Sequence, residues 1–172
     1  MDQSTPSASE AYSAEFLIAV RRVIADEGGD SSNPADAGGA TRFGISARAY
    51  PAVDIATLTR DVAVKIYWDE WWVRFGFAHL PAAVAAKAFD LAVNIGASNA
   101  IECLQRALRA SGMPVTEDRA IGPATASAAA RAESTVLMAA MRSEFAAHYR
   151  LVAAKQNRDQ AFLKGWLNRA YA

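Results

Sequence analysis

Two carboxylates flank a glycine-rich stretch of the sequence: Glu27 in "ADEGG" and Asp36 in "NPADAGG". Glu27 lies at helical spacing from Val20 and Val23, so it continues the apolar face of a helix and stands at that helix's last turn. Partial burial and the negative end of the helix dipole both disfavour a charged carboxylate, so both raise the pKa expected for Glu27. A carboxylic acid that stays protonated near neutral pH suits general-acid catalysis, as in the cleavage of a glycosidic bond.

Asp36 is the candidate for the second carboxylate that a glycosidase needs. It follows Glu27 by nine residues, in a loop bounded by proline and glycine whose reversal would bring the two groups opposite each other. Thr41 follows five residues later, at the start of a short strand, where its hydroxyl would position a water molecule between the carboxylates. The distance between the carboxylates decides between retention and inversion at the sugar, and both outcomes stay open.

Each of these three residues also has an ordinary structural interpretation. A glutamate followed by two glycines is a common helix C-terminus, and an aspartate in "NPADAGG" can hold a turn through its own backbone. A threonine at the third position simply favours a strand. A catalytic role for the three is therefore a hypothesis, and the neighbouring sequence has to add to it.

The elements that must position these residues are helices with one interruption. Apolar spacing predicts a helix that starts after Ser13 and ends at the glycine pair after Glu27. The segment "GGATRFGIS" predicts the one short strand and hairpin, and Asn99 with Glu102 predicts a capping box. Further helices are predicted near residues 60–74, 83–95, 99–110, 123–132, 135–156 and 160–170.

Composition limits the class of protein. The 172 residues, 52% of them hydrophobic, supply enough apolar material for one core, which predicts a flexible segment 1–12 and a single domain over 13–172. A net charge of zero argues against nucleic-acid binding, and the single Cys103 excludes an internal disulfide. No secretory signal or bilayer-spanning stretch is recognisable, so we expect synthesis in the cytoplasm and no stable membrane insertion.

No metal or cofactor is expected. His79 and His148 are far apart in the sequence and have no cysteine or carboxylate neighbours at metal-ligand spacing. The stretch "GGATRFG" lacks the strand and the helix that flank a dinucleotide-binding loop.

Five further residues are candidate substrate contacts. Asp90 and Asn94 are four residues apart on one face of an apolar helix, where they either form a structural hydrogen-bond network or contact an N-acetyl group or the catalytic acid. Trp68 and Trp72 recur at helical spacing in "IYWDEWWVRFGF", where one aromatic face belongs to the core and another can stack on sugar rings. Arg42, beside the candidate threonine, is the fifth.

Four motifs, "EGG", "NPADAGGATRFGIS", "FDLAVNIG" and "FLKGWLNRA", occur in this order along the chain. Their order and spacing resemble the N-acetylmuramidase family of phage endolysins and bacterial secretion-activator proteins, over residues 14–170. The resemblance implies a mainly α, lysozyme-like fold with a small β-hairpin beside the active-site cleft. It also implies hydrolysis of the bond between N-acetylmuramic acid and N-acetylglucosamine in peptidoglycan, with Glu27 of the EGG motif as the catalytic glutamate.

The spacing of the other two candidates is similar to that of phage lysozymes, in which a glutamate is the acid while an aspartate and a threonine manage the water. Four residues instead of five separate Asp36 from Thr41 here. The stretch "LQRALRASGMPVTEDRAIGPAT" resembles peptidoglycan-binding modules, with Arg119 in place of a glycine of their pattern. We therefore expect a catalytic lobe over 13–80 and a helical lobe over 81–170 within one domain.

We expect a monomeric enzyme that acts on peptidoglycan in the periplasm of a Gram-negative host and causes cell-wall lysis. A holin or a secretion apparatus would give it access to the wall. A bacterial secretion role would use the same chemistry as phage lysis. Two other functions stay open: a lytic transglycosylase, which also needs a glutamic acid, and a non-catalytic peptidoglycan-binding or secretion-accessory protein.

Overall fold

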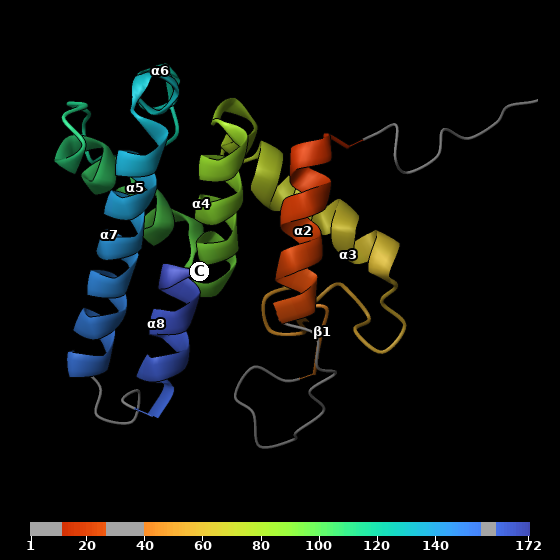
Figure 1. Cartoon of the computed structure of the whole chain (residues 1–172). Helices are drawn as coiled ribbons and strands as arrows, with labels where there is room; N and C mark the ends of the chain where they lie inside the picture. The colour runs from red at the N-terminus through yellow and green to blue at the C-terminus, as the bar shows by residue number, and fades with distance from the viewer. Residues whose placement is uncertain (1–11, 27–39, 156–160) are drawn as a thin grey trace, which may run out of the picture. The chain divides into compact units, whose positions relative to one another are not determined.

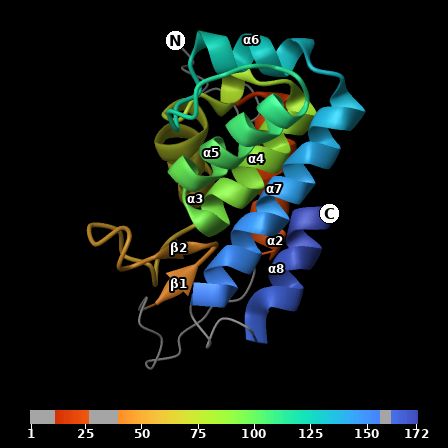
Figure 2. The same ribbon diagram turned by 90° about the vertical axis from the view of Figure 1, so that its left-hand side faces the viewer.

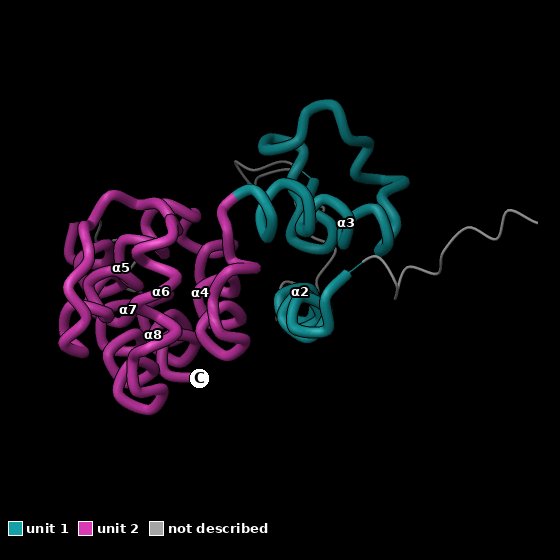
Figure 3. Tube along the Cα trace, turned by 90° about the horizontal axis from the view of Figure 1, so that it is seen from above, with its two compact units in different colours: residues 1–74 teal, residues 75–172 magenta. Residues whose placement is uncertain are grey.

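The computed structural model describes residues 12–26, 40–155 and 161–172, and it is mainly helical with one small antiparallel sheet (Figure 1). The chain forms two compact units, residues 1–74 and 75–172 (Figure 3). The predicted fold class, mainly α with a small β-hairpin, is confirmed. The division into lobes 13–80 and 81–170 of one domain stays a prediction, and the predicted flexible segment falls almost entirely outside the described residues.

Helix α2, Ala14–Asp26, is the first described element of the N-terminal unit. It starts where the sequence predicts, because the backbone N–H of Phe16 donates a hydrogen bond of 3.3 Å to the side-chain oxygen of Ser13. The predicted stop at the glycine pair lies outside the described residues. One face of the helix is buried, and it consists of Phe16, Ala19, Val20, Val23 and Ile24.

The predicted hairpin is confirmed, with strand β1, Thr41–Arg42, paired antiparallel to β2, Ile45–Ser46. The two residues between the strands both have positive φ, 53° at Phe43 and 79° at Gly44. Such a turn matches the twist of the flanking strands, and glycine makes it easy at the second position.

Helix α3, Arg60–Tyr67, continues directly into a π-helical turn, η1, Trp68–Val73. The prediction of one helix over 60–74 is therefore confirmed in extent, although the wider turn within it was not predicted. Phe16 of α2 packs on both tryptophans, with ring centroids 4.9 Å from Trp68 and 5.4 Å from Trp72. This aromatic cluster forms the core of the N-terminal unit.

The C-terminal unit is built from helices. The short η2, Phe77–His79, precedes the longer ones, which are α4, Ala82–Ile95; α5, Ala97–Ala110; α6, Pro123–Arg131; α7, Ser134–Lys155; and α8, Leu163–Tyr171. Helix α5 packs against α4 and α7, and α8 packs along α7 (Figure 2). The predicted helices of this unit are confirmed to within three residues at each described end.

The predicted capping box at Asn99 and Glu102 is wrong. Helix α5 begins two residues before Asn99, and its N-cap is Gly96, whose φ of 84° turns the chain sharply after α4. Asn99 instead donates a hydrogen bond of 2.8 Å to the carbonyl of Ile95, and Glu102 forms an ion pair of 2.7 Å with Arg106. The turn at Gly96 thus moves the helix start away from the residues that could have capped it.

Candidate active site

Glu27 and Asp36 both lie outside the described residues, so their catalytic roles stay predictions. The elements on either side of them are described. Helix α2 ends at Asp26, one residue before Glu27, and the hairpin starts at Thr41, five residues after Asp36. The apolar face on which the Glu27 prediction rests is buried up to Ile24, which is 5% exposed.

Thr41 and Arg42 lie in β1, on a hairpin that is anchored within its own unit. The hydroxyl of Tyr67 in α3 donates a hydrogen bond of 3.1 Å to the carbonyl of Phe43 at the hairpin turn. The guanidinium of Arg42 lies 5.2 Å from the centroid of the Phe43 ring and donates a hydrogen bond of 3.0 Å to the carbonyl of Ala56. Arg42 thus has a structural role in the hairpin, whereas a contact with substrate stays a prediction.

The two candidate tryptophans differ in accessibility. Trp72 is 1% exposed and belongs to the aromatic core, while the indole of Trp68 is half-buried. Trp68 is therefore the more accessible of the two for stacking on a sugar ring. Another half-buried pair was not predicted: the indole N–H of Trp71 donates a hydrogen bond of 3.0 Å to the hydroxyl of Tyr50, whose pKa is raised by burial.

Asp90 is 3% exposed in α4 and is held by an arginine from the far end of the chain. The guanidinium of Arg169 in α8 donates to both carboxylate oxygens, at 3.0 Å from Nη2 and 3.3 Å from Nε. The ammonium of Lys87 donates a hydrogen bond of 2.7 Å to the backbone carbonyl of the same arginine. These bonds fasten α8 to α4, and they join the motifs "FDLAVNIG" and "FLKGWLNRA" in one contact.

Asn94 is exposed at the end of α4, and its side-chain oxygen accepts a hydrogen bond of 2.7 Å from the hydroxyl of the buried Tyr149 in α7. Asp90 and Asn94 therefore both take part in contacts between helices. These contacts favour the structural alternative for the two residues. A direct contact with an N-acetyl group or with the catalytic acid stays a prediction.

The stretch that resembles peptidoglycan-binding modules is organised around one buried amide. Gln105 in α5 is 0% exposed, and its Nε2 donates to the carboxylate of Asp118 at 2.7 Å, the carbonyl of Ala120 at 3.0 Å and the hydroxyl of Thr125 at 3.2 Å. Its Oε1 accepts a bond of 3.0 Å from the backbone N–H of Arg119. The Leu-Gln, Asp and Ile-Gly-Pro-x-Thr parts of the pattern thus meet at Gln105.

Arg119 replaces the glycine of that pattern and still makes the tight turn. Its φ of 62° lies in the left-handed region, which costs a residue with a side chain more than it costs glycine. Two contacts compensate for this cost. One is the hydrogen bond to Gln105, and the other is an ion pair of 2.8 Å between its guanidinium and Glu102.

Replacing Gln105 by leucine is expected to lower the free energy of unfolding by about 1–3 kcal/mol, because it removes the amide's bonds to the loop and its bond to the hydroxyl of the buried Thr125. Urea unfolding followed by circular dichroism measures the change. Thr116, which is exposed in the same loop region, provides the control: Thr116→Ala should stay within about 0.5 kcal/mol of the wild type. Equal stability of Gln105→Leu and the wild type would mean that the loop needs no central amide.

The described part of the chain contains neither a metal site of three or more ligands nor a reactive cysteine. Among its residues, no three His, Cys, Asp or Glu side chains are grouped closely enough to hold a metal ion. Burial raises the pKa of the Cys103 thiol to about 12, so it stays protonated at neutral pH and is a poor nucleophile. No described helix combines the length and the apolar character needed to cross a bilayer.

Comparisons with known proteins add a family context to this geometry. The family model of glycosyl hydrolase 108 matches residues 20–96, and the model of a predicted peptidoglycan domain matches residues 99–171. The first match contains all eight candidate site residues, and the second covers the Gln105 network and α8. A search of curated proteins found no match.

A solved structure, that of SagA from Brucella abortus, is similar along most of its length. It is 29% identical in sequence, and the alignment covers 90% of this chain and 88% of that chain with a TM-score of 0.72. The aligned region therefore includes residues of both compact units.

Proposed function

The chain belongs to the glycosyl hydrolase 108 family, with a peptidoglycan domain in its C-terminal part, and we propose that it is an N-acetylmuramidase. The family implies a peptidoglycan hydrolase. The proposed reaction is hydrolysis of the β-1,4 bond between N-acetylmuramic acid and N-acetylglucosamine, with Glu27 as the general acid.

The observation that supports this assignment most is the course of α2. Its buried apolar face leads through Val23 and Ile24 to its end at Asp26, and Glu27 is the next residue. A carboxyl group that follows such a face at the C-terminal end of a helix experiences both desolvation and the negative helix dipole. Both effects favour the protonated form that a general acid requires.

The proposed mechanism divides the work among three residues. Glu27 protonates the glycosidic oxygen as the bond breaks, and Asp36 activates water or stabilises the positive charge that develops on the sugar. Thr41 helps to place that water. The anchoring of the hairpin by Tyr67 supports this last role, because a hydroxyl that orients water must itself be held in place.

The proposal extends to the place and result of the reaction. We propose that the protein is synthesised in the cytoplasm, gains access to the periplasm of a Gram-negative host through a holin or a secretion apparatus, and acts on the wall as a monomer. Cell-wall lysis is the expected consequence. Neither nucleic acid nor a cofactor has a part in this mechanism.

Digestion of purified Gram-negative peptidoglycan, with product masses read by mass spectrometry, tests the reaction type. Reducing-end muropeptides support the muramidase. Anhydro sugars would assign the chain to the lytic transglycosylases, which close the muramic acid ring without water. Binding to the wall without any released product would mean that the chain is a peptidoglycan-binding or secretion-accessory protein.

Asp36→Asn separates hydrolysis from transglycosylation in a second way. A hydrolase that depends on this carboxylate for its water should lose about 10²-fold or more in rate, whereas a transglycosylase should be nearly unaffected. Initial rates of muropeptide release provide the measurement. Asp69→Asn is a matched control, because Asp69 is an exposed aspartate in the same unit whose ion pair with Lys65 lies on the surface; it should keep full activity.

A further inference from the structure

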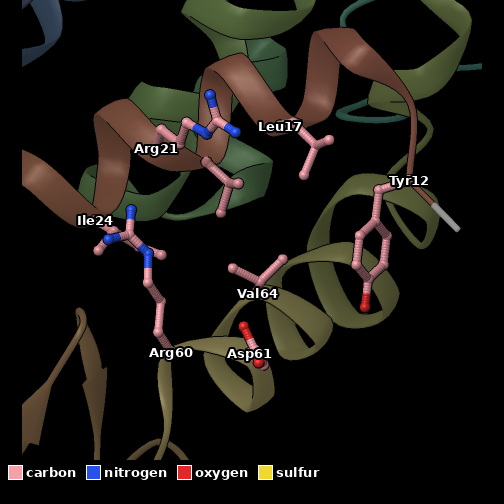
Figure 4. Close-up of a pocket in the computed structure, with 8 residues that line it drawn as sticks. Tyr12, Leu17, Arg21, Ile24, Arg60, Asp61 and Val64 are labelled. Atoms are coloured by element: carbon pink, nitrogen blue, oxygen red, sulfur yellow. The ribbon is translucent and has the colours of Figure 1, made fainter. Parts of the chain in front are cut away.

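A groove of about 460 Å³ lies between α2 and α3 in the N-terminal unit (Figure 4). This volume is in the range of sites that hold small ligands. Its apolar lining comes from both helices and from the segment before α2, and it consists of Tyr12, Leu17, Val20, Ile24 and Val64.

Three charged side chains border the groove: Arg21 from α2, with Arg60 and Asp61 from the first turn of α3 (Figure 4). Both arginines are exposed, and within the described part of the chain no hydrogen bond or ion pair engages either guanidinium. A guanidinium presents a planar fork of donors that matches a carboxylate. The groove thus offers two arginines that can bind carboxylates and one aspartate that can bind a cation, beside its apolar lining.

We propose that this groove binds the peptide stem of peptidoglycan. This inference rests on the proposed function, because it takes peptidoglycan as the substrate. The stem of Gram-negative peptidoglycan carries carboxylates and the ammonium of a diamino acid, separated by the methyl groups of alanines. Arg21 and Arg60 bind the carboxylates, Asp61 faces the ammonium, and the apolar floor accepts the methyl groups.

The alternative occupant, the glycan itself, matches the groove less well. Sugar rings with hydroxyl and N-acetyl groups bring no negative charge to the guanidiniums of Arg21 and Arg60. The position of the groove along α2 is also consistent with binding of the peptide stem. Ile24 in the groove lies only two residues, about 3 Å of helix rise, before the end of α2 at Asp26. The stem is attached to the muramic acid whose bond is cut, so its site has to lie near the catalytic acid.

Calorimetric titration with the free stem tetrapeptide, L-Ala-γ-D-Glu-meso-diaminopimelate-D-Ala, tests the inference. The double variant Arg21→Gln/Arg60→Gln should weaken binding about tenfold or more, because it removes two charge-assisted contacts. Arg22→Gln is the matched control: Arg22 is exposed and next to Arg21 on α2 but does not line the groove, so its binding should equal that of the wild type.

Three outcomes of the titration would overturn the inference. They are the absence of binding by the wild type, unchanged binding by the double variant, and an equal loss in Arg22→Gln, which would reduce the effect to net charge. Circular dichroism of each variant confirms that the helices are retained. All three arginines are exposed, so the substitutions remove no buried contact.

Kinetics on two substrates separate this inference from the proposed function. Wild-type protein should show a higher KM on glycan strands from which an amidase has removed the stems than on intact peptidoglycan, and the double variant should lose that preference. Equal KM values on both substrates would refute the groove assignment while leaving the muramidase intact. If neither substrate is cut, the proposed function fails, and the tetrapeptide titration still decides whether the groove binds the stem.

Discussion

Replacing Glu27 by glutamine is expected to abolish the release of reducing-end muropeptides from peptidoglycan while wall binding is retained. Glutamine has nearly the same shape as glutamic acid, but its amide cannot give a proton to the glycosidic oxygen. General-acid catalysis contributes about 10²–10⁴-fold to rate, so a loss within that range is expected. Mass-spectrometric counting of released products against time measures it, and co-sedimentation with cell walls measures the retained binding.

Glu15→Gln provides the control for this substitution. Glu15 is an exposed glutamate in the first turn of α2, the helix that ends one residue before Glu27, so the control makes the same chemical change far from that end. It should keep full activity. A Glu27→Gln variant that retains most of its activity would show that the proton comes from another group, and the assignment of Glu27 would then fail.

The parts of the fold that the sequence predicted are those that local rules determine. Helical spacing of apolar residues placed α2 to α8, Ser13 marked the start of α2, and "GGATRFGIS" marked the hairpin. Each of these signals depends on residues within one turn or one loop of each other. The same local reasoning failed at Asn99, because it did not include the positive φ that Gly96 adopts immediately before the helix.

The contacts that local rules missed join residues far apart in the sequence. Asp90 and Arg169 are 79 residues apart, and no periodicity links an aspartate in one helix to an arginine in another. Gln105 was visible only as part of a motif, although its bond to Thr125 spans 20 residues. In the sequence, only the family motifs indicated such long-range contacts. The structure shows that the motifs "FDLAVNIG" and "FLKGWLNRA" are joined by the ion pair between Asp90 and Arg169.

In the candidate site too, some features were predicted from local patterns and others depend on tertiary packing. The helix that leads to Glu27 and the hairpin that carries Thr41 were predicted from local patterns, and both elements are present. The aromatic faces of α3 and η1 were predicted as a mixture of core and surface, and the π-helical turn was not anticipated from spacing. The division between a buried Trp72 and an accessible Trp68 required the packing of α2 against them.

Arg169→Met is expected to lower the free energy of unfolding of the C-terminal unit by about 3–5 kcal/mol, which is the usual cost of breaking a buried ion pair from one side. The side chain of Asp90 is 5% exposed, and its carboxylate would remain buried without its bidentate partner. The contact between α8 and α4 would weaken at the same time. Urea unfolding followed by circular dichroism measures the loss.

The double variant Asp90→Leu/Arg169→Met separates the charge from the packing. If the loss of stability arises from a buried carboxylate without its partner, replacing both residues by apolar ones should recover most of the stability. A well-packed apolar pair is often as stable as the buried ion pair. Equal instability of the single and double variants would instead mean that the guanidinium contributes mainly through shape and its other bonds. The same pair of variants examines Asp90 as a substrate contact: a recovered fold with a collapsed kcat would give this aspartate a role in the reaction, whereas recovery of both would make it a residue that fastens α8 to α4.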